Sequence, residues 1–376
     1  MRKKLINFLQ KTKKSYSIVK NFYNTPYNKN ILICYNVNVF LSNKSSFHTN
    51  YQESHIIAKT FSDLGFNIDI ISFDNPTEID FSKYDVLFGF GLSFEKSFSS
   101  NRPQLRIYYA TGAHLCHQNQ AEILRVCEVN EKKSSFLKPK RLQQWALSQS
   151  TSMSDAMIII GNEWTKSTYE KYCFQPLYCL NATSLYQNNN SFLQRDINMA
   201  KMNFLWFGSG GLVHKGLDLC LDFFSTHPKF HLHICGPVEE DFYSVYNHEL
   251  NLPNIHLHGF IDVNTNKFIE IMEQCLFSIM PSCSEGQSTA LLTTMATGLI
   301  PLASKENGKN IDNLGFLIND LSPSGIKHAI HNALAQNDEI LQNLSRSNIE
   351  EIRRLHSLEN FTVEFNNIIK KILYIK

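Results

Sequence analysis

Short apolar runs rich in β-branched residues alternate with stretches of helical period from residue 31 onward. Runs that are apolar on both faces are typical of strands in parallel sheets covered by helices on both sides. The first series of predicted strands lies at residues 31–37, 68–73, 86–91, 105–111, 156–162 and 176–181. The second series lies at residues 203–209, 231–237, 255–260, 277–282 and 299–304. A polar, asparagine-rich segment at residues 186–202 separates the two series. It has neither a helical nor a strand period and is predicted to be a linker.

Two such series predict two doubly wound, Rossmann-like α/β domains that face a shared cleft. The length of 376 residues agrees, because it exceeds what one core usually holds. The predicted limits are a leader at 1–28, an N-terminal domain at 29–195, a C-terminal domain at 196–355 and a last helix at 356–376. That helix has the length to cross back to the N-terminal domain. In open parallel sheets ligands bind beyond the carboxyl ends of the strands, so residues just after each strand are the candidates for a site.

Composition narrows the class of protein. Hydrophobic residues make up 43% of the chain and the formal net charge is +2, which indicates a globular protein and a poor fit to nucleic acid. The nine cysteines form no C-x-x-C pair, so we read them as reduced thiols of a cytosolic protein, not as a disulfide framework or a zinc site. No apolar run is long enough to span a bilayer.

The first residues form a basic leader that mixes lysines with apolar side chains. Between residues 2 and 20 it carries one arginine and six lysines and no acidic residue. Such a segment can lie on an anionic membrane surface. The alternative is a solvated leader that only keeps the chain soluble.

A glycine-rich turn, GSGGLVHKG, follows the first strand of the second series. Gly210 and Gly211 let the backbone approach a ligand closely. Lys215 and the start of a helix come next, and this combination suits a phosphate or diphosphate. The same residues also fit a tight strand-to-helix turn with a surface lysine.

Glu285 is the single acidic residue in PSCSEGQSTALLTTMATGLIPLAS, residues 281–304. It lies between a predicted strand and a helix that is predicted to begin near Ser288 or Thr289 and to end at Gly298. The free amides at a helix start attract an anion. We therefore expect a diphosphate at the amides, with Glu285 turned toward the neutral hydroxyl groups of a sugar. The simpler alternative is that Glu285 caps the helix.

The segments around these two features resemble the GT-B-fold retaining glycosyltransferases of family 4, within glycosyl transferases group 1. The similarity spans about residues 203–304 and includes FLWFGSGGLVHKGLDLCL, HLHICGP, IHLHGFID and the segment around Glu285. The family signature has two glutamates separated by seven residues. This chain keeps the frame without a gap, with Glu285 at the first position and Thr293 at the second.

The resemblance implies a role for each matching position. Glu285 would hold hydroxyl groups of the donor sugar, and Lys215 with the amides of residues 286–289 would hold the nucleotide diphosphate. The implied donor-binding residues are Gly210, Gly211, Phe260, Ile261, Gly286, Gln287, Ser288, Thr289 and Thr293. The arginine that the family places before the lysine is missing, and His214 is only a weak substitute. Thr293 replaces the ribose-binding carboxylate, which puts that contact in doubt.

The first domain matches the family less specifically. His114 follows a predicted strand and resembles the histidine that meets the donor sugar from the opposite domain, so it joins Glu285 and Lys215 as a candidate catalytic residue. A structural histidine is the alternative. The candidate acceptor-binding residues are Asn50, Glu53, Asn119 and Arg125. For the last two, a solvated helix face is the competing interpretation.

The resemblance implies transfer of a sugar from a nucleotide-sugar to an acceptor hydroxyl, with the anomeric configuration retained and without a cofactor or required metal. The basic leader suggests a glycan or lipid-linked acceptor at the inner membrane face, in bacterial surface polysaccharide or glycolipid assembly. Two other functions stay open on the same fold. One is a non-catalytic scaffold or partner subunit, and the other is a sugar-nucleotide epimerase.

Overall fold

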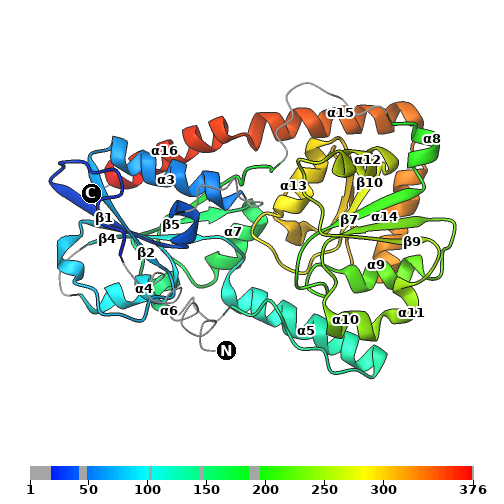
Figure 1. Cartoon of the computed structure of the whole chain (residues 1–376), viewed down its shortest axis with the longest axis horizontal. Helices are drawn as coiled ribbons and strands as arrows, with labels where there is room; N and C mark the ends of the chain where they lie inside the picture. The colour runs from blue at the N-terminus through cyan, green and yellow to red at the C-terminus, as the bar shows by residue number, and fades with distance from the viewer. Residues whose placement is uncertain (1–17, 42–48, 101–103, 144–147, 186–194, 375–376) are drawn as a thin grey trace, which may run out of the picture.

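The computed structural model describes residues 18–41, 49–100, 104–143, 148–185 and 195–374 (Figure 1). Most of the predicted leader therefore lies outside the described residues. The part of it that is described runs beside the first sheet, where Val19 forms an antiparallel bridge with Ile70. Lys20 there donates to Asp69 over 2.6 Å. No helix of the described residues is both long and apolar enough to cross a bilayer.

The N-terminal domain is built on a six-stranded parallel sheet of order β2-β1-β3-β4-β5-β6. Its strands are β1 (Lys29–Tyr35), β2 (Phe66–Ser72), β3 (Val86–Gly89), β4 (Leu105–Ala110), β5 (Ala156–Ile160) and β6 (Leu177–Leu180). Its helices are α2 (Asn38–Leu41), α3 (Asn50–Asp63), α4 (Gly91–Glu95), α5 (Leu115–Lys133), α6 (Ser148–Ser152) and α7 (Glu163–Glu170). Central strands such as β3 and β5 are buried along their whole length, as expected for a sheet covered on both faces.

The C-terminal domain repeats the plan with a parallel sheet of order β12-β11-β10-β7-β8-β9. Its strands are β7 (Asn203–Phe207), β8 (His231–Cys235), β9 (Ile255–Gly259), β10 (Phe277–Met280), β11 (Ile300–Ala303) and β12 (Phe316–Leu317). Its helices are α8 (Ile197–Ala200), α9 (Leu217–Phe224), α10 (Glu240–Val245), α11 (Asn247–Leu250), α12 (Asn266–Gln274), α13 (Thr289–Ala296) and α14 (Pro323–Leu334). The predicted α/β class with two doubly wound parallel sheets is confirmed.

Every predicted strand has a counterpart, and each ends one or two residues earlier than predicted. The sequence did not predict β12, which has only two residues at the sheet edge. The short helix α8 lies in the segment predicted to be a linker without helical period, so that prediction was wrong for residues 197–200. The exact domain limits stay a prediction.

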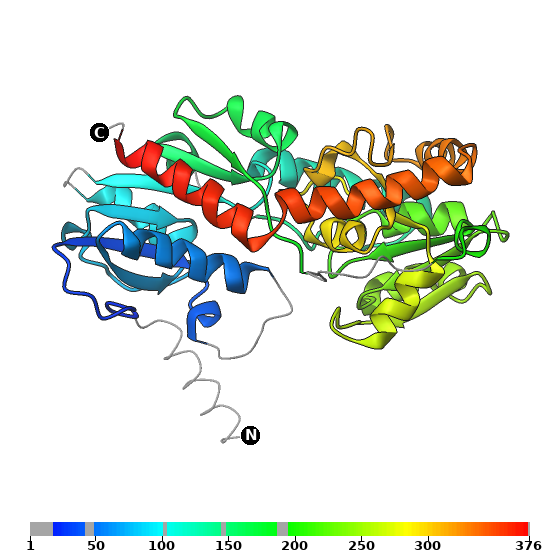
Figure 2. The same ribbon diagram turned by 90° about the horizontal axis from the view of Figure 1, so that it is seen from above.

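Two helices in line, α15 (Asp338–Leu355) and α16 (Leu358–Tyr374), run along one side of both sheets (Figures 1 and 2). Helix α15 packs on the C-terminal domain through α13, whereas α16 packs on α3 of the N-terminal domain. The rings of Phe365 and Phe61 meet there with their centroids 6.1 Å apart. Helix α16 thus packs as part of the first domain.

Helix α5 crosses in the opposite direction and lies under the C-terminal domain (Figure 1). Its buried Arg125 pairs with Asp218 at the start of α9. At its last turn Lys132 pairs with Asp222 over 2.7 Å and Lys133 with Glu249 over 2.6 Å. These contacts bring the loop after α5, residues 134–143, to the edge of the second domain.

Candidate functional site

A cavity of about 350 Å³ lies where the carboxyl ends of the two sheets face each other. Both domains line it, mainly with residues at or just after strand ends. These include Tyr35, Thr111 and Ile160 from the first domain and Gly208, Gly236 and Phe260 from the second. This is the edge at which doubly wound sheets bind ligands.

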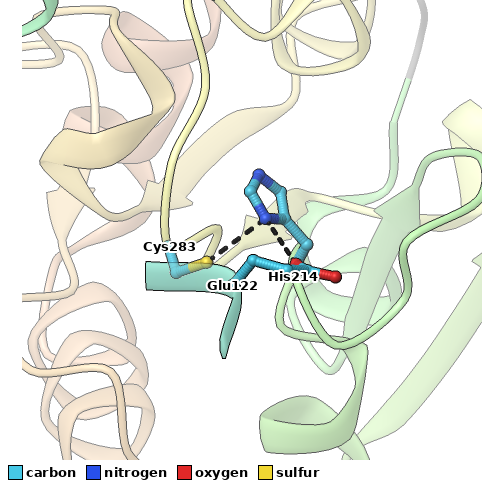
Figure 3. A group of neighbouring side chains, drawn as sticks. All are labelled: Glu122, His214 and Cys283. Carbon is cyan, nitrogen blue, oxygen red and sulfur yellow. Dashed lines mark hydrogen bonds and ion pairs between the residues drawn. The ribbon is translucent and has the colours of Figure 1, made fainter. Parts of the chain in front are cut away.

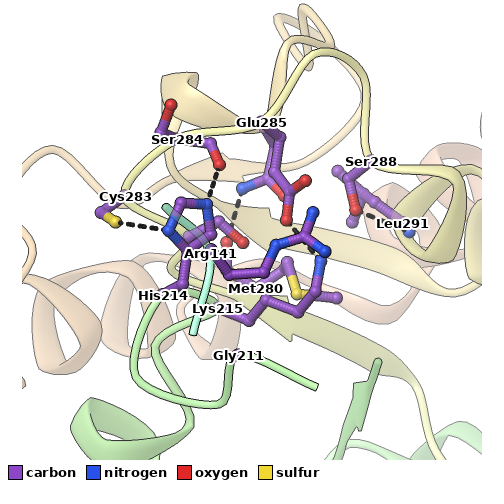
Figure 4. Close-up of polar contacts among 12 residues, drawn as sticks. Arg141, Gly211, His214, Lys215, Met280, Cys283, Ser284, Glu285, Ser288 and Leu291 are labelled. Carbon is purple, nitrogen blue, oxygen red and sulfur yellow. Dashed lines mark hydrogen bonds and ion pairs between the residues drawn. The ribbon is translucent and has the colours of Figure 1, made fainter. Parts of the chain in front are cut away.

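Glu285 and Lys215 form an ion pair in the wall of this cavity (Figure 4). Both side chains are nearly buried, with 11% and 8% of their surface exposed. Burial by itself would raise the pKa of Glu285, but the charges of Lys215 and Arg141 lower it to about 2. Glu285 is therefore an anion at neutral pH, and it is an acceptor for hydroxyl groups that enter the cavity.

Ser288, and not Glu285, caps helix α13. Its hydroxyl accepts the amide of Leu291 over 3.4 Å, and the helix begins at Thr289 as predicted. The amide of Ser288 itself donates to the carbonyl of Asn307 over 2.9 Å. This amide is therefore not available to a diphosphate, contrary to the expectation from the sequence. Within the described residues, the amides of Gly286, Gln287 and Thr289 have no protein acceptor. Three of the four implied amides thus remain open to an anion at a helix start.

The loop that carries Glu285 also contacts the first domain. The carbonyl of Gly286 accepts the hydroxyl of Thr165 over 2.7 Å. The side chain of Gln287 accepts the amide of Ala182 over 2.7 Å and donates to the carbonyl of Gly308 over 3.1 Å. Gln287 lines the cavity, but its amide group holds the loop to the connection between the domains.

The glycine-rich turn contributes less of the cavity wall than expected. Gly208 and the following serine line the cavity, whereas Gly210 and Gly211 are not part of its wall. Gly211 has a φ of +85°, and a Cβ there would lie 2.5 Å from Cγ of Arg141. Its amide donates to Glu239 over 2.7 Å. Gly211 is thus required by the close approach of Arg141, not by an approach to a ligand.

Arg141 is the residue that the sequence interpretation missed. It comes from the first domain, lines the cavity and lies beside Lys215 and Glu285 (Figure 4). Its backbone is fixed on both sides, because its amide donates to Glu122 over 3.1 Å and its carbonyl accepts Gln118 over 2.6 Å. The only signal in the sequence is the basic run KPKR at residues 138–141, which has no specific spacing.

The segment after β9 reaches the cavity as predicted. Phe260 and Ile261 both line it, with Phe260 62% exposed and Ile261 buried. A large exposed aromatic ring at a cavity mouth is suited to stacking on a planar ligand.

Thr293 does not line the cavity. Its hydroxyl donates to the carbonyl of Thr289 over 2.7 Å and accepts the amide of Leu185 over 3.4 Å. The side chain is fully buried. Thr293 is therefore, like Gly210 and Gly211, a predicted donor-binding residue outside the cavity wall.

His114 does not line the cavity either. It caps helix α5, accepting the amide of Cys116 on Nδ1, and its ring stacks on Tyr172 with centroids 4.2 Å apart. Burial, followed by the nearby His117, lowers the pKa of His114 to about 4. These contacts are those of a structural histidine, which is the alternative stated for His114 in the sequence analysis.

The four candidate acceptor residues fall into two groups. Asn50 and Glu53, at the start of α3, line the cavity. Glu53 also accepts the amide and the hydroxyl of Thr183, each over 2.8 Å. Asn119 instead holds the backbone of Gln143, and Arg125 pairs with Asp218 and Glu128. Neither residue is part of the cavity wall; Arg125 is buried, whereas Asn119 is half-buried.

His214, the weak substitute for the missing arginine, points away from the cavity. Its Nδ1 lies 2.8 Å from Oε2 of Glu122, and its Nε2 contacts the carbonyl of Ser284. Both ring nitrogens are thus engaged within the protein, and among the described residues of the cavity wall the cations are Lys215 and Arg141.

Comparisons with known proteins concern the second domain and the overall fold. Residues 202–336 match the model of the family described as Glycosyl transferases group 1. No curated protein matches the chain significantly. The similar solved structures are only 11–14% identical in sequence to this chain. At this level, the similarity shows a shared fold but does not show shared substrates.

Three of the similar solved structures illustrate matches that cover nearly the whole chain. Sucrose-phosphate synthase from Thermosynechococcus elongatus has a TM-score of 0.63 and 11% identity, covering 93% of this chain and 100% of its own. Anabaena Alr3699/HepE in complex with UDP and glucose has a TM-score of 0.58 and 12% identity, covering 93% and 100%. WaaG, a glycosyltransferase involved in lipopolysaccharide biosynthesis, has a TM-score of 0.55 and 14% identity, covering 90% and 99%. The chain therefore has the GT-B fold of these structures, and within it residues 202–336 match the model of the family described as Glycosyl transferases group 1.

Proposed function

We propose that the protein transfers a sugar from a nucleotide-sugar to an acceptor hydroxyl and retains the anomeric configuration. The observation that carries the proposal is the buried Lys215–Glu285 pair in the cavity between the two sheets. A lone carboxylate and a cation beside open helix amides suit a ligand that is part sugar and part diphosphate.

Each group has a role in this reaction. As the bond between sugar and diphosphate breaks, negative charge builds up on the leaving diphosphate. Lys215 and the open amides at the start of α13 stabilise that charge, which lowers the barrier. Glu285 accepts hydroxyl groups of the sugar and so fixes the sugar's position relative to the diphosphate. No step needs a metal ion or a cofactor.

Arg141 supplies a second positive charge to the diphosphate in this proposal. Because it belongs to the first domain, the donor site is complete only when the two domains face each other as they do here. When the cleft closes, Arg141 therefore reaches the diphosphate and neutralises part of its negative charge. Closure also excludes water from the transfer.

The acceptor side of the cavity belongs to the N-terminal domain, where Asn50 and Glu53 lie at the start of α3. The similarity in fold to WaaG supports an acceptor in surface polysaccharide or glycolipid assembly. We further propose that the protein acts in the cytoplasm at the inner membrane face, with the basic residues 2–20 as the contact to anionic lipid.

One observation favours a second function, that of a non-catalytic scaffold or partner subunit. Thr293 occupies the position of the family's ribose-binding carboxylate, and its hydroxyl bonds to backbone instead of facing the cavity. A protein that has lost donor binding would tolerate this change.

Calorimetric titration with UDP, GDP and dTDP separates the two functions. The transferase proposal predicts that at least one of them binds and that Lys215→Ala weakens the binding about tenfold or more. Absence of binding by all three nucleotides would favour the scaffold and count against the transferase.

A further inference from the structure

Three buried side chains beside the cleft do not face the cavity and have no role in the proposed transfer. They are Glu122 on α5, His214 in the glycine-rich turn and Cys283 between β10 and α13 (Figure 3). Their exposed fractions are 1%, 1% and 4%. One carboxylate oxygen, one ring nitrogen and the sulfur all lie within 4.8 Å of one another.

The distances between these atoms are close to those in a zinc site. Nδ1 of His214 lies 3.5 Å from Sγ of Cys283. In tetrahedral zinc coordination the nitrogen and sulfur ligands are about 3.6 Å apart, so this pair needs almost no movement. Nδ1 lies 2.8 Å from Oε2 of Glu122. A zinc-bound nitrogen and oxygen are about 3.4 Å apart, so the carboxylate has to withdraw by about 0.6 Å.

Contacts outside the group already orient two of the three side chains. Nε2 of His214 faces the carbonyl of Ser284, which directs Nδ1 toward Glu122 and Cys283. The other oxygen of Glu122 accepts the backbone amides of Lys140 over 2.6 Å and Arg141 over 3.1 Å. Hydrogen bonds of this kind, from the far side of a histidine and of a carboxylate, hold the ligands in place in metal sites.

We propose that Glu122, His214 and Cys283 bind a divalent transition-metal ion of the zinc class, with water as the fourth ligand. One imidazole, one thiolate and one carboxylate are a ligand set that zinc accepts. On binding, bonds form from Sγ, Nδ1 and a carboxylate oxygen to the ion. The thiol proton and the Nδ1 proton leave to solvent.

The ion would fasten the two domains, because Glu122 comes from the first domain and the other two ligands from the second. It lies outside the transfer reaction, which needs no metal, so this inference does not depend on the proposed function. The site could not be predicted from the sequence, because its ligands are far apart along the chain and match no ligand spacing. The alternative is that His214 only bridges Glu122 and Ser284 by hydrogen bonds, with Cys283 as a passive neighbour.

Cobalt titration of the full chain, after removal of metal with a chelator, distinguishes these two arrangements. Cobalt bound to a thiolate gives a charge-transfer absorption band in the near ultraviolet, which histidine-only binding does not. This matters because neighbouring histidines on β8 and β9, such as His231 and His256 at 3.0 Å, are a second place for adventitious metal. We expect the band to saturate at one equivalent and to disappear when zinc is added.

Two matched alanine variants complete the test. Cys283→Ala should abolish the band, whereas Cys275→Ala, which changes another buried cysteine, should keep it. Glu122→Gln should weaken cobalt binding roughly tenfold or more. Circular dichroism of each variant checks the fold, and if Cys283→Ala fails to fold, His214→Asn takes its place. The proposal is overturned if the wild-type protein gives no band, or if the band persists in the variant that lacks Cys283 or His214.

Discussion

At the scale of single residues, Glu285 illustrates how a buried charge is tolerated. Taking a carboxylate out of water is costly unless a partner compensates its charge. Lys215 is that partner, and it comes from the turn after β7, a different part of the same domain. The sequence predicted both residues as donor-site groups, but their pairing depends on how two strand ends meet. A spacing pattern cannot show this.

Replacing Lys215 by methionine should destabilise the protein, because it leaves the buried carboxylate of Glu285 without the cation that is paired with it directly. We expect a loss of about 3–5 kcal/mol in the free energy of unfolding, as for other broken buried pairs. Urea unfolding followed by circular dichroism measures this loss.

The double variant Lys215→Met/Glu285→Gln provides the control for this prediction. It removes the charge together with its partner, so most of the lost stability should return. If the single and double variants were equally unstable, the buried pair would not explain the effect.

At the scale of elements, the strands and helix α13 could be predicted because their signals are local. Buried apolar runs specify the strands, and Ser288 with Gly298 marks the limits of one helix. Side-chain direction could not be predicted in the same way. Thr293 turns its hydroxyl to the backbone, and His114 caps α5 instead of facing the cleft. Arg141 reaches the site only because α5 crosses to the second domain.

The contact between Gly211 and Arg141 gives a prediction at this scale. A methyl group at Gly211 would lie 2.5 Å from Cγ of Arg141, so Gly211→Ala should displace the arginine from the cavity. We expect weaker binding of the nucleotide found in the titration, by about the same factor as for Arg141→Ala. Calorimetry of the single variants and of their combination measures this.

Gly65→Ala is a suitable control, because Gly65 also has a positive φ but has open space around its α-carbon. It should cost only about 1–2 kcal/mol of stability for the backbone conformation and leave nucleotide binding unchanged. Additive effects of Gly211→Ala and Arg141→Ala would show that the glycine does not act through the arginine.

At the scale of the whole molecule, two crossings join the domains on opposite sides of the cleft. One is the α15–α16 pair and the other is α5 (Figure 1). His356 lies between α15 and α16, and its Nδ1 donates to the carbonyl of Ala182 over 2.7 Å. Its backbone carbonyl accepts the amide of Ser184. The buried His356 thus holds the segment after β6, around Ala182 and Ser184, against the junction of α15 and α16.

Acidification should loosen this junction. Burial, together with the charge of Lys309, lowers the pKa of His356 to about 3, so the ring stays neutral in the folded protein. In the unfolded chain its pKa is about 6.5, so between these values the unfolded state binds more protons. Stability therefore falls as the pH drops below about 6.5, and His356 alone accounts for roughly 2 kcal/mol between pH 7 and pH 5.

Urea unfolding at pH 7 and pH 5 checks this prediction. The wild type should lose more stability on acidification than His356→Asn, in which the titrating group is absent. His248→Asn, at an exposed histidine, should behave like the wild type. Equal pH dependence in wild type and His356→Asn would contradict the assignment.

The most direct test of the central claim is product formation from a panel of nucleotide-sugars, measured for the wild type and for Glu285→Gln. We expect that the wild type consumes one nucleotide-sugar and that the variant still binds this nucleotide-sugar but turns it over roughly a hundredfold more slowly. Turnover by Glu285→Gln at the wild-type rate would contradict the proposed role of Glu285, because the carboxylate would then have no part in holding the sugar.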